Sequence, residues 1–489
     1  MLDRTSWNWT FFVGHDRRVP ANPFPFPQGR PVMLHRLSFL LVAATVALGS
    51  SAAGAAENRL RLATFQCDVT PPPGAPLCDA LVEPAREIVD RLHACGIVLL
   101  GAERPVVLCA VDWVGVGNSG YDRFREELAV AAGTTPDRVA LHCLHQHDAP
   151  GCDFAANELL APFGLENKLF DAGFALDAMK RTAAALTAAL STQQAITHVG
   201  FGHGRVEQVA STRRVLGADG KVKFVRYTSC KDPAVRAEPE GLIDPAVQLV
   251  SFWNGETPLV SITYYATHPQ SYYGAGGVSD DFPGMARRLR EADLPAVAHI
   301  HFNGAGGNVT AGKYNDGAPE NRPVLAQRLA AGMKLAWEST TKHAVQPADV
   351  EWRMRPVALP LARPLEDVAA LKATLANDKA DLRERLRAAR NLAWALRCQS
   401  GRKIDLTCLK VGPGYLVHMP GELFVEYQLA AQKMRPGQPV CMAAYGDYAP
   451  GYIGTAIAYT QGGYETGPVS RVAPEVEAVL IAALRELLK

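Results

Sequence analysis

The sequence has almost no charge imbalance: 50 Lys and Arg face 49 Asp and Glu, a formal net charge of +1. It has no block of basic residues that would follow a phosphate backbone, which argues against nucleic acid as a partner. Its ten cysteines include no Cys-x-x-Cys spacing, which argues against a structural zinc cluster. Beyond the N-terminal leader, no apolar run approaches the roughly 20 residues of a spanning helix, so no transmembrane span is expected in the mature chain.

The N-terminal region has the layout of a secretory leader. His35-Arg36 is a short basic region, residues 37–48 are apolar, and small residues lead up to Ala56. We expect residues 33–56 to be a signal peptide cleaved near Ala56, and the mature protein to be exported, to a periplasm or out of the cell. Residues 1–32 are then a misassigned start or a disordered extension. All ten cysteines follow the leader and are available for disulfides in an oxidising compartment, with pairing left open.

Strand-like and helical runs alternate along residues 57–489, which we expect to form a single domain. Apolar runs at 60–65, 106–111 and 139–143 predict strands. Helices are predicted between them, over residues 84–94 and 121–132. Such alternation is typical of the α/β class.

The later part of the chain continues this alternation. Two runs flanking Asn254-Gly255 predict a β-hairpin. The charged ladder of the helical segment 365–398 is interpreted as a solvated face, with no chemistry assigned to it. The remaining predicted helices cover 168–190, 283–291, 422–433 and 474–488, and the remaining strands 246–253, 259–265, 297–302, 415–419 and 439–445.

Two imidazoles stand one residue apart after the predicted strand 139–143. Side chains alternate along an extended strand, so His145 and His147 are expected to point the same way from its C-terminal end. That arrangement suits the start of a metal site. An ordinary alternative is a surface or core histidine held by a backbone carbonyl.

Three later segments share this layout of an apolar run that ends in polar residues at a tight turn, and they contain His268, Glu422 and Tyr452. Ligands gathered from several strand ends are typical of sites on α/β scaffolds, and two histidines with a glutamate suit zinc. Each residue also has an ordinary role open to it. His268 could be a turn residue, Glu422 a favourable carboxylate at a helix N-terminus, and Tyr452 a rim aromatic.

A glycine-rich segment, FNGAGGNVTAG at 302–312, lies between His268 and Glu422. Such a loop can bring backbone N–H groups close to a developing oxyanion, bind phosphate, or form a tight turn. It lacks the GK[ST] ending of a nucleotide-binding P-loop, which argues against NTP binding.

The ordered segments LHQHDAPG, THPQSYYGAGGVSDDFPG, GAGGNVTAG, MPGE and YIGTAIAYTQGGYE resemble the neutral/alkaline ceramidases, in their catalytic N-terminal domain. LHQHDAPG matches the family's THTHSGPG, VSDDFPG its VSGDNKG, and Pro420-Gly421-Glu422 its PGE. The resemblance covers most of the mature chain and implies an α/β fold of mixed β-sheets flanked by helices. The chain ends at Lys489, so we do not expect the immunoglobulin-like C-terminal domain of full-length ceramidases.

The resemblance implies roles for particular residues. His147 and Tyr464 would lie over the substrate amide, as proton donor or oxyanion stabiliser, and Arg213 matches an arginine in the family's NRS segment. Thr310 takes the place of the active-site serine of GDVSPN, read here as GNVTAG. It keeps a hydroxyl but adds a methyl that stiffens χ1, and Asn308 replaces an aspartate. The residues implied to hold a catalytic Zn²⁺ are His145, His268, Glu422 and Tyr452.

The implied reaction is hydrolysis of an N-acyl amide, in ceramide or a ceramide-like lipid, by metal-activated water. Thr310 is expected to hydrogen-bond the water or substrate, because a threonine nucleophile needs a base and none is apparent beyond His147. The expected partner is a small-molecule or lipid amide, with transient contact to a membrane surface. Alternatives are the same scaffold acting on an N-acyl amino acid, an N-acyl sugar or an ester, or a non-catalytic lipid- or glycan-binding protein. A zinc phosphoesterase is disfavoured, because too few carboxylates lie near the histidines for a second metal.

Overall fold

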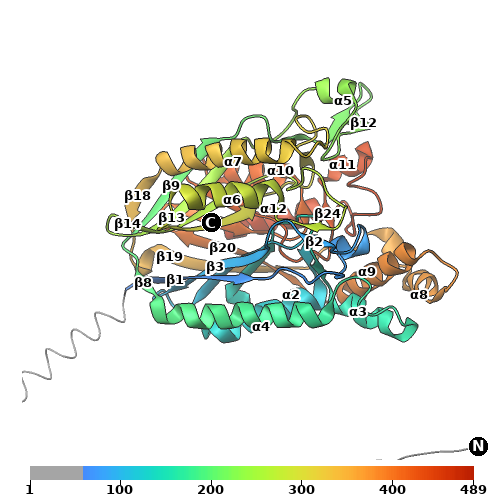
Figure 1. Ribbon diagram of the computed structural model, residues 1–489, viewed down its shortest axis with the longest axis horizontal. Helices are drawn as coiled ribbons and strands as arrows, with labels where there is room; N and C mark the ends of the chain where they lie inside the picture. The colour runs from blue at the N-terminus through green and yellow to red at the C-terminus, as the bar shows by residue number, and fades with distance from the viewer. Residues whose placement is uncertain (1–58) are drawn as a thin grey trace, which may run out of the picture. The chain divides into compact units, whose positions relative to one another are not determined.

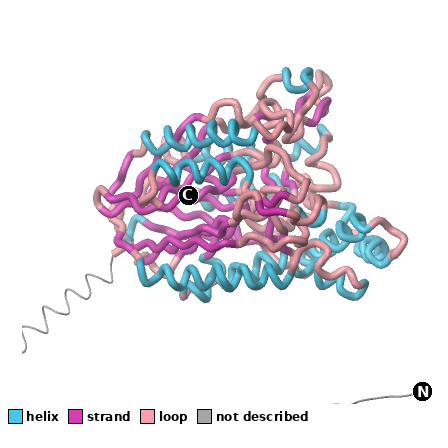
Figure 2. The backbone as a smooth tube through the Cα atoms, in the orientation of Figure 1, coloured by secondary structure: helices cyan, strands magenta, loops and turns pink. Residues whose placement is uncertain are grey.

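Two five-stranded mixed sheets form the centre of the fold, and each carries helices on its outer face (Figure 1). The computed structural model describes residues 59–489, so the predicted signal peptide at 33–56 and residues 1–32 lie outside the described residues. Figure 2 shows the strands between two outer groups of helices. The predicted α/β class with mixed sheets flanked by helices is confirmed.

The first sheet has the strand order β6-β4-β3-β1-β8. Most of its pairs are antiparallel, but β4 and β6 run parallel, joined by helix α2 (Asn118–Ala132). Helix α4 (Ala172–Ala189) packs beside α2 on the outer face. The strands are β1 (Arg61–Asp68), β3 (His93–Leu100), β4 (Val106–Val111), β6 (Val139–Cys143) and β8 (Gln194–Ala195).

Both faces of this sheet are buried, as β4 illustrates. Val107, Cys109 and Val111 pack in the core under α2 and α4. The alternate residues, Val106 and Leu108 among them, pack in the core between the two sheets. Burial on both faces explains why this strand is a continuous apolar run without polar alternation.

The second sheet has the order β16-β14-β13-β9-β18. The predicted hairpin is confirmed as β13 and β14, with Gly255 at a φ of 59° in its turn. Strand β16 runs parallel to β14, and helices α6 (Asp281–Asp293) and α7 (Asn321–Glu338) cover the outer face. The strands are β9 (His198–Arg205), β13 (Ala246–Asn254), β14 (Thr257–Tyr265), β16 (Ala298–Asn303) and β18 (Thr341–Ala344).

A third, four-stranded sheet has the order β19-β20-β21-β23. Its last two strands run parallel and are joined through helix α10 (Val425–Met434). Helix α12 (Val476–Leu487) packs against this sheet. The strands are β19 (Val350–Val357), β20 (Ile404–Val411), β21 (Gly414–His418) and β23 (Val440–Ala443).

Two of the predicted helices are wrong in part or entirely. The segment 84–94 holds β2 (Glu87–Ile88) and the start of β3, because β3 pairs with β1 on one side and β4 on the other. Pairing on both sides overrides local propensity. The segment 365–398 is two helices, α8 (Val368–Ala376) and α9 (Leu382–Gln399).

All ten cysteines are free, and seven of them are buried. No disulfide therefore forms among residues 59–489, and most of these cysteines pack as small apolar side chains. None of the helices within residues 59–489 combines the length and apolar character needed to cross a membrane.

Candidate metal centre

Each of the three large sheets contributes one residue to a common cluster, and each does so beside a parallel strand pair. His145 follows β6, which is parallel to β4, and His268 follows β14, which is parallel to β16. Glu422 follows β21, which is parallel to β23. Parallel neighbours have their carboxyl ends at the same edge of a sheet. The loop after the partner strand is therefore close enough to hold each residue in place.

His145 is oriented by the loop after β4. The carbonyl oxygen of Val114 lies 2.7 Å from His145 Nδ1. His145 itself has a φ of 71°, a conformation that is uncommon for a residue with a side chain and is concentrated at functional sites. Strand β6 ends at Cys143, so strand alternation does not set the directions of His145 and His147 as predicted. Their rings lie edge to face instead, with centroids 5.1 Å apart.

His268 is oriented by the glycine-rich segment after β16. Its Nδ1 lies 2.6 Å from the Gly306 carbonyl, and its backbone N–H donates to the Val309 carbonyl at 2.9 Å. A Cβ on Gly307 would lie 2.3 Å from the Glu422 carbonyl oxygen, so only glycine fits there. The predicted loop thus serves the site through its carbonyl oxygens, which hold His268.

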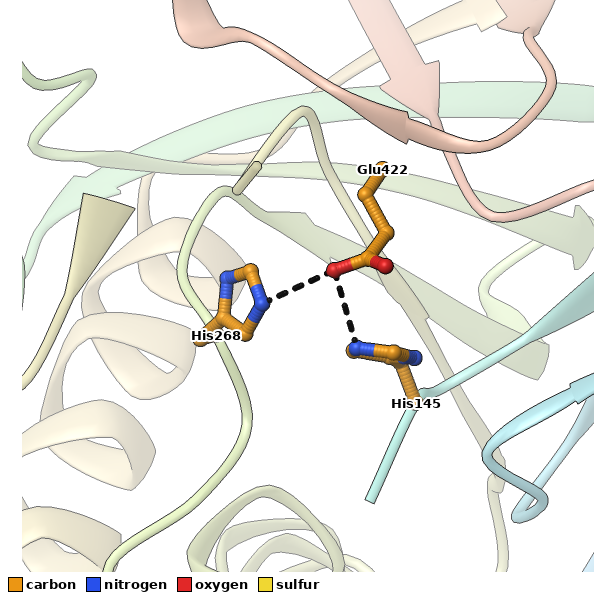
Figure 3. A group of neighbouring side chains, drawn as sticks. All are labelled: His145, His268 and Glu422. Carbon is orange, nitrogen blue, oxygen red and sulfur yellow. Dashed lines mark hydrogen bonds and ion pairs between the residues drawn. The ribbon is translucent and has the colours of Figure 1, made fainter. Parts of the chain in front are cut away.

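Glu422 lies between the two histidines, as Figure 3 shows. Its Oε2 is 3.2 Å from His145 Nε2 and 3.1 Å from His268 Nε2. Its other oxygen, Oε1, accepts a hydrogen bond from the Tyr448 hydroxyl at 3.2 Å, and Tyr448 belongs to the loop after β23. The third sheet therefore repeats the arrangement of the other two, with a side chain in place of a carbonyl.

A bound cation would stabilise this cluster, in which unprotonated nitrogens face a carboxylate oxygen. A carbonyl only accepts hydrogen bonds, so the protons of His145 and His268 are on Nδ1 and each Nε2 presents a lone pair. Burial lowers the pKa of His268 to about 4, which keeps its ring neutral near pH 7. His145 Nε2 has no hydrogen-bond donor among residues 59–489. Buried acceptors that face a carboxylate are unfavourable unless a positive ion lies among them.

The donor set fits zinc. The three ligand atoms of His145, His268 and Glu422 lie within 4.8 Å of one another, and all three residues are buried. Two imidazole nitrogens and one carboxylate, with a position left open, are a common ligand set of catalytic zinc. Hydrogen bonds from Nδ1 to carbonyls are the usual way that ligating histidines are held.

Tyr452, the fourth predicted ligand, adjoins the same cluster. It lies on β24 (Tyr452–Ile453), which pairs with β22 (Glu422–Leu423) so that Glu422 and Tyr452 are directly opposite. The pairing makes Glu422 a strand residue, not a helix N-terminal carboxylate. The Tyr452 oxygen is 3.0 Å from His268 Nε2 and accepts a hydrogen bond from Arg213 Nη1 at 2.8 Å.

Arg213 is buried behind Tyr452, beside the buried carboxylate of Glu465. Its Nε lies 3.6 Å from Glu465, which Arg214 also contacts at 3.0 Å. Burial raises the pKa of the Tyr452 phenol well above its usual range, whereas the positive charge of Arg213 acts in the opposite direction. Arg213 thus places a positive charge beside the Tyr452 oxygen.

His147 and Tyr464 border the open space around the cluster. Two cavities of about 350 and 520 Å³ share His147, Tyr452 and Tyr464 in their walls. His147 is half-buried, and its ring nitrogens bond to no other residue of the described chain. Burial, together with nearby His145 and His268, lowers the pKa of His147 well below its usual range. Tyr464 is 40% exposed, and burial of the rest raises its phenol pKa to about 12.

Thr310 is not brought to the cavities. Its hydroxyl is fully buried, donates to the Arg226 carbonyl at 3.0 Å and accepts from the Gly312 N–H at 3.3 Å. It lies on β17 (Val309–Thr310), which pairs with β10 (Ser211–Thr212), directly before Arg213. In this arrangement Thr310 supports the backbone beside Arg213.

Sequence reasoning missed two groups of residues at this site. Tyr448 holds Glu422, and its only signal was membership of the same turn segment as Tyr452. Three arginines of α9 line the 350 Å³ cavity, although the charged ladder of this segment was interpreted as a solvated face. Arg383 and Arg387 are exposed, as that interpretation requires, but they also line the cavity.

Comparison with known proteins identifies the fold. No protein-family model and no curated protein sequence matches the chain. Two solved structures do: a ceramidase complexed with C2, at 15% identity, and the neutral ceramidase from Pseudomonas aeruginosa, at 16%. Both superpose with a TM-score of 0.63 over 88% of this chain, and over 75% and 74% of the respective ceramidase chains. The chain therefore has a neutral-ceramidase-like fold.

Proposed function

We propose that this protein is a zinc-dependent hydrolase that cleaves an N-acyl amide bond in a ceramide-like lipid amide. The observation that carries the proposal is the convergence of three proton-free ligand atoms, from His145, His268 and Glu422, two of which, His145 and Glu422, line a cavity. The likeness in fold to neutral ceramidases supports the same reaction class.

His145, His268 and Glu422 would hold the ion, with the Tyr452 oxygen as a further ligand. A zinc ion bound there supplies Lewis acidity, which polarises an amide carbonyl and makes water a nucleophile near neutral pH. The carbonyls of Val114 and Gly306 accept hydrogen bonds from His145 and His268, and the Tyr448 hydroxyl donates one to Glu422. These bonds would hold the ligands before any ion arrives. Such preorganisation reduces the cost of binding.

His147 would act as the proton-transfer group. Its lowered pKa leaves the ring neutral, with one nitrogen able to take a proton from the attacking water. The same ring would then give the proton to the leaving amine nitrogen. Its place in the walls of both cavities supports contact with a substrate that spans them.

Tyr464 would stabilise the oxyanion that forms on the substrate carbonyl. With a pKa raised to about 12, its phenol stays protonated at neutral pH and donates a hydrogen bond. Arg213, held between Glu465 and Tyr452, would keep the local potential positive as negative charge develops.

The test is a metal analysis joined to a substrate screen. Purified protein should contain about one zinc per chain and release amine from a fluorogenic N-acyl sphingosine or from short N-acyl amides. His145→Ala and His268→Ala should each lose the metal and lower kcat/KM by about 10³-fold or more. His203→Ala replaces an exposed histidine and serves as the matched control.

Two outcomes would contradict the proposal. If both alanine variants kept full metal content and activity, the ligand assignment would be wrong. If the protein bound zinc but turned over no amide or ester, it would be a binding protein on the same scaffold.

A further inference from the structure

Four arginines line the 350 Å³ cavity that also contains His145 and Glu422. We call these residues the arginine wall: Arg383, Arg387, Arg390 and Arg471. The first three are spaced i, i+4 and i+7 along α9, which places them on one helix face. In Figure 1, α9 lies at the end of the sheets where β24 is labelled.

The positive charge of this wall is only partly compensated. Arg390 contacts Asp79 at 2.8 Å. Arg383 and Arg387 are exposed and form no ion pair with any residue between 59 and 489. The cavity has only one further carboxylate in its lining, Glu422, which belongs to the metal cluster.

Among the four arginines, Arg471 gives the strongest support for an anion-binding site. It is only 7% exposed, and its bonds go to neutral acceptors: Nε donates to the Asn391 side chain at 2.8 Å and Nη1 to the Ala449 carbonyl at 3.0 Å. No carboxylate lies within 4.0 Å of it in the described chain. Burial, reinforced by nearby Arg390, lowers its pKa to about 10, in contrast to Arg390, whose pKa is raised next to Asp79.

A buried guanidinium without a carboxylate partner is costly, and a ligand anion in the cavity would remove that cost. Guanidinium groups also match carboxylates and phosphates geometrically, because they donate parallel hydrogen bonds. The lining is apolar only in part, at residues such as Leu169, Leu386 and Val469. A volume of about 350 Å³ is at the low end of the roughly 300–1,000 Å³ typical for small-molecule sites.

We infer that the arginine wall binds an anionic group, a carboxylate or a phosphate, carried by the N-acyl substrate. The inference rests on the proposed amide hydrolysis, but it departs from a ceramide-like substrate in the charge of the group that the amide carries. N-acyl amino acids and related charged amides would be preferred over a neutral ceramide. Because Arg390 and Arg471 lie inside the cavity and not on an outer face, the geometry favours a substrate group over the head groups of an anionic membrane.

Binding is measured first, without turnover. The probes are N-hexylsulfonylglycine and N-hexylsulfonylglycinamide, which differ only in carboxylate against carboxamide and which an amidase does not cleave. Calorimetry on the zinc-loaded protein should give at least about tenfold tighter binding of the carboxylate, the size of a charge-assisted hydrogen bond. Equal affinity, or preference for the carboxamide, would overturn the inference.

The second measurement removes charge from the wall. The double variant Arg383→Gln/Arg387→Gln breaks no ion pair within residues 59–489, so the fold of that part should be retained. The ratio of carboxylate to carboxamide affinity should fall several-fold towards one, and so should the ratio of kcat/KM for N-hexanoylglycine and N-hexanoylglycinamide. Arg355→Gln, an exposed arginine on β19 that lines neither cavity, should leave both ratios unchanged.

The binding and turnover measurements distinguish the proposed amide hydrolysis from the proposed anion site. Carboxylate preference in binding with no turnover of any amide would overturn the proposed function and keep the anion site. Turnover without carboxylate preference would do the reverse. Cleavage of the neutral substrate that rises on anionic vesicles, dependent on Arg383 and Arg387, without preference for the soluble carboxylate, would overturn the inference in favour of membrane docking.

Discussion

The candidate metal site (His145, His268 and Glu422) and the arginine wall border the same cavity, yet their charges are arranged differently. In the cluster, each ligand has its own orienting partner: Val114 for His145, Gly306 for His268, and Tyr448 for Glu422. In the wall, Arg390 contacts a carboxylate, whereas the buried Arg471 and the exposed Arg383 and Arg387 form no ion pair with any residue of the described part, 59–489.

This difference is what the proposed roles, catalysis in one case and recognition in the other, require. Catalytic groups must be held close to one geometry before the substrate arrives, which requires fixed partners within the protein. A group that recognises a ligand gains most when its natural counter-ion is the ligand itself, because the protein has not already satisfied it. The cluster should therefore respond to small changes in its supports, and the wall to changes in its net charge.

The largest effect is expected from Glu422→Gln, which removes the shared carboxylate. Metal affinity should fall by more than about 100-fold, since changes behind the ligands alone cost about 10–100-fold. The metal-free variant should be at least as stable as the metal-free wild type, because the new amide can donate to one Nε2 where the carboxylate cannot. Chelator competition and thermal unfolding measure the two effects.

Glu158→Gln, an exposed glutamate on α3 (Phe154–Leu160), is the control for Glu422→Gln and should change neither quantity. A metal-free Glu422→Gln protein that melts well below metal-free wild type would contradict the proposed lone-pair arrangement. It would mean that an imidazole proton faces the carboxylate.

A smaller effect is expected from Tyr448→Phe, which keeps the ring and removes the hydroxyl that donates to Glu422. Metal affinity should fall about tenfold, because a free carboxylate oxygen leaves the ligand less well oriented. Tyr459→Phe removes a hydroxyl that bonds to Ser470 and is the matched control. Unchanged zinc affinity in Tyr448→Phe would show that the third sheet does not hold its ligand as the other two do.

The smallest effect is expected from Asp79→Asn, which frees Arg390 from its carboxylate. Asp79 has a φ of 53° and ψ of 39°, and asparagine adopts this left-handed conformation readily. The carboxylate probe should bind about threefold tighter, the scale of a weak ion pair, while the carboxamide probe is unaffected. Asp378→Asn, an exposed acid between α8 and α9, is the control. Weaker binding of the carboxylate would show that Asp79 organises the wall for a different ligand.

Parts of the fold and the ligand residues could be predicted because their signals are local. The run 106–111 is apolar throughout, and Asn254-Gly255 selects a hairpin turn whatever surrounds it. The local sequence predicts a helix up to residue 94. Only the flanking strands β1 and β4 decide that the stretch 93–100 is a strand. The charged residues of α9 fit a solvated helix face, because helical periodicity does not show whether such a face meets bulk water or lines a cavity, as three of its arginines do.

By itself, the sequence determined which side chains could serve as ligands and that they follow apolar strands: His145, His268, Glu422 and Tyr452 each stand at a turn marked by proline or glycine. The tertiary structure decided how they are held. Parallel pairing in three separate sheets brings a carbonyl to His145 and to His268 and a hydroxyl to Glu422, and so sets which nitrogen of each histidine carries the proton. The packing of α9 beside the same cavity adds its positive charge. Such contacts join segments that are distant in the chain, so they depend on sheet pairing and packing and not on local sequence.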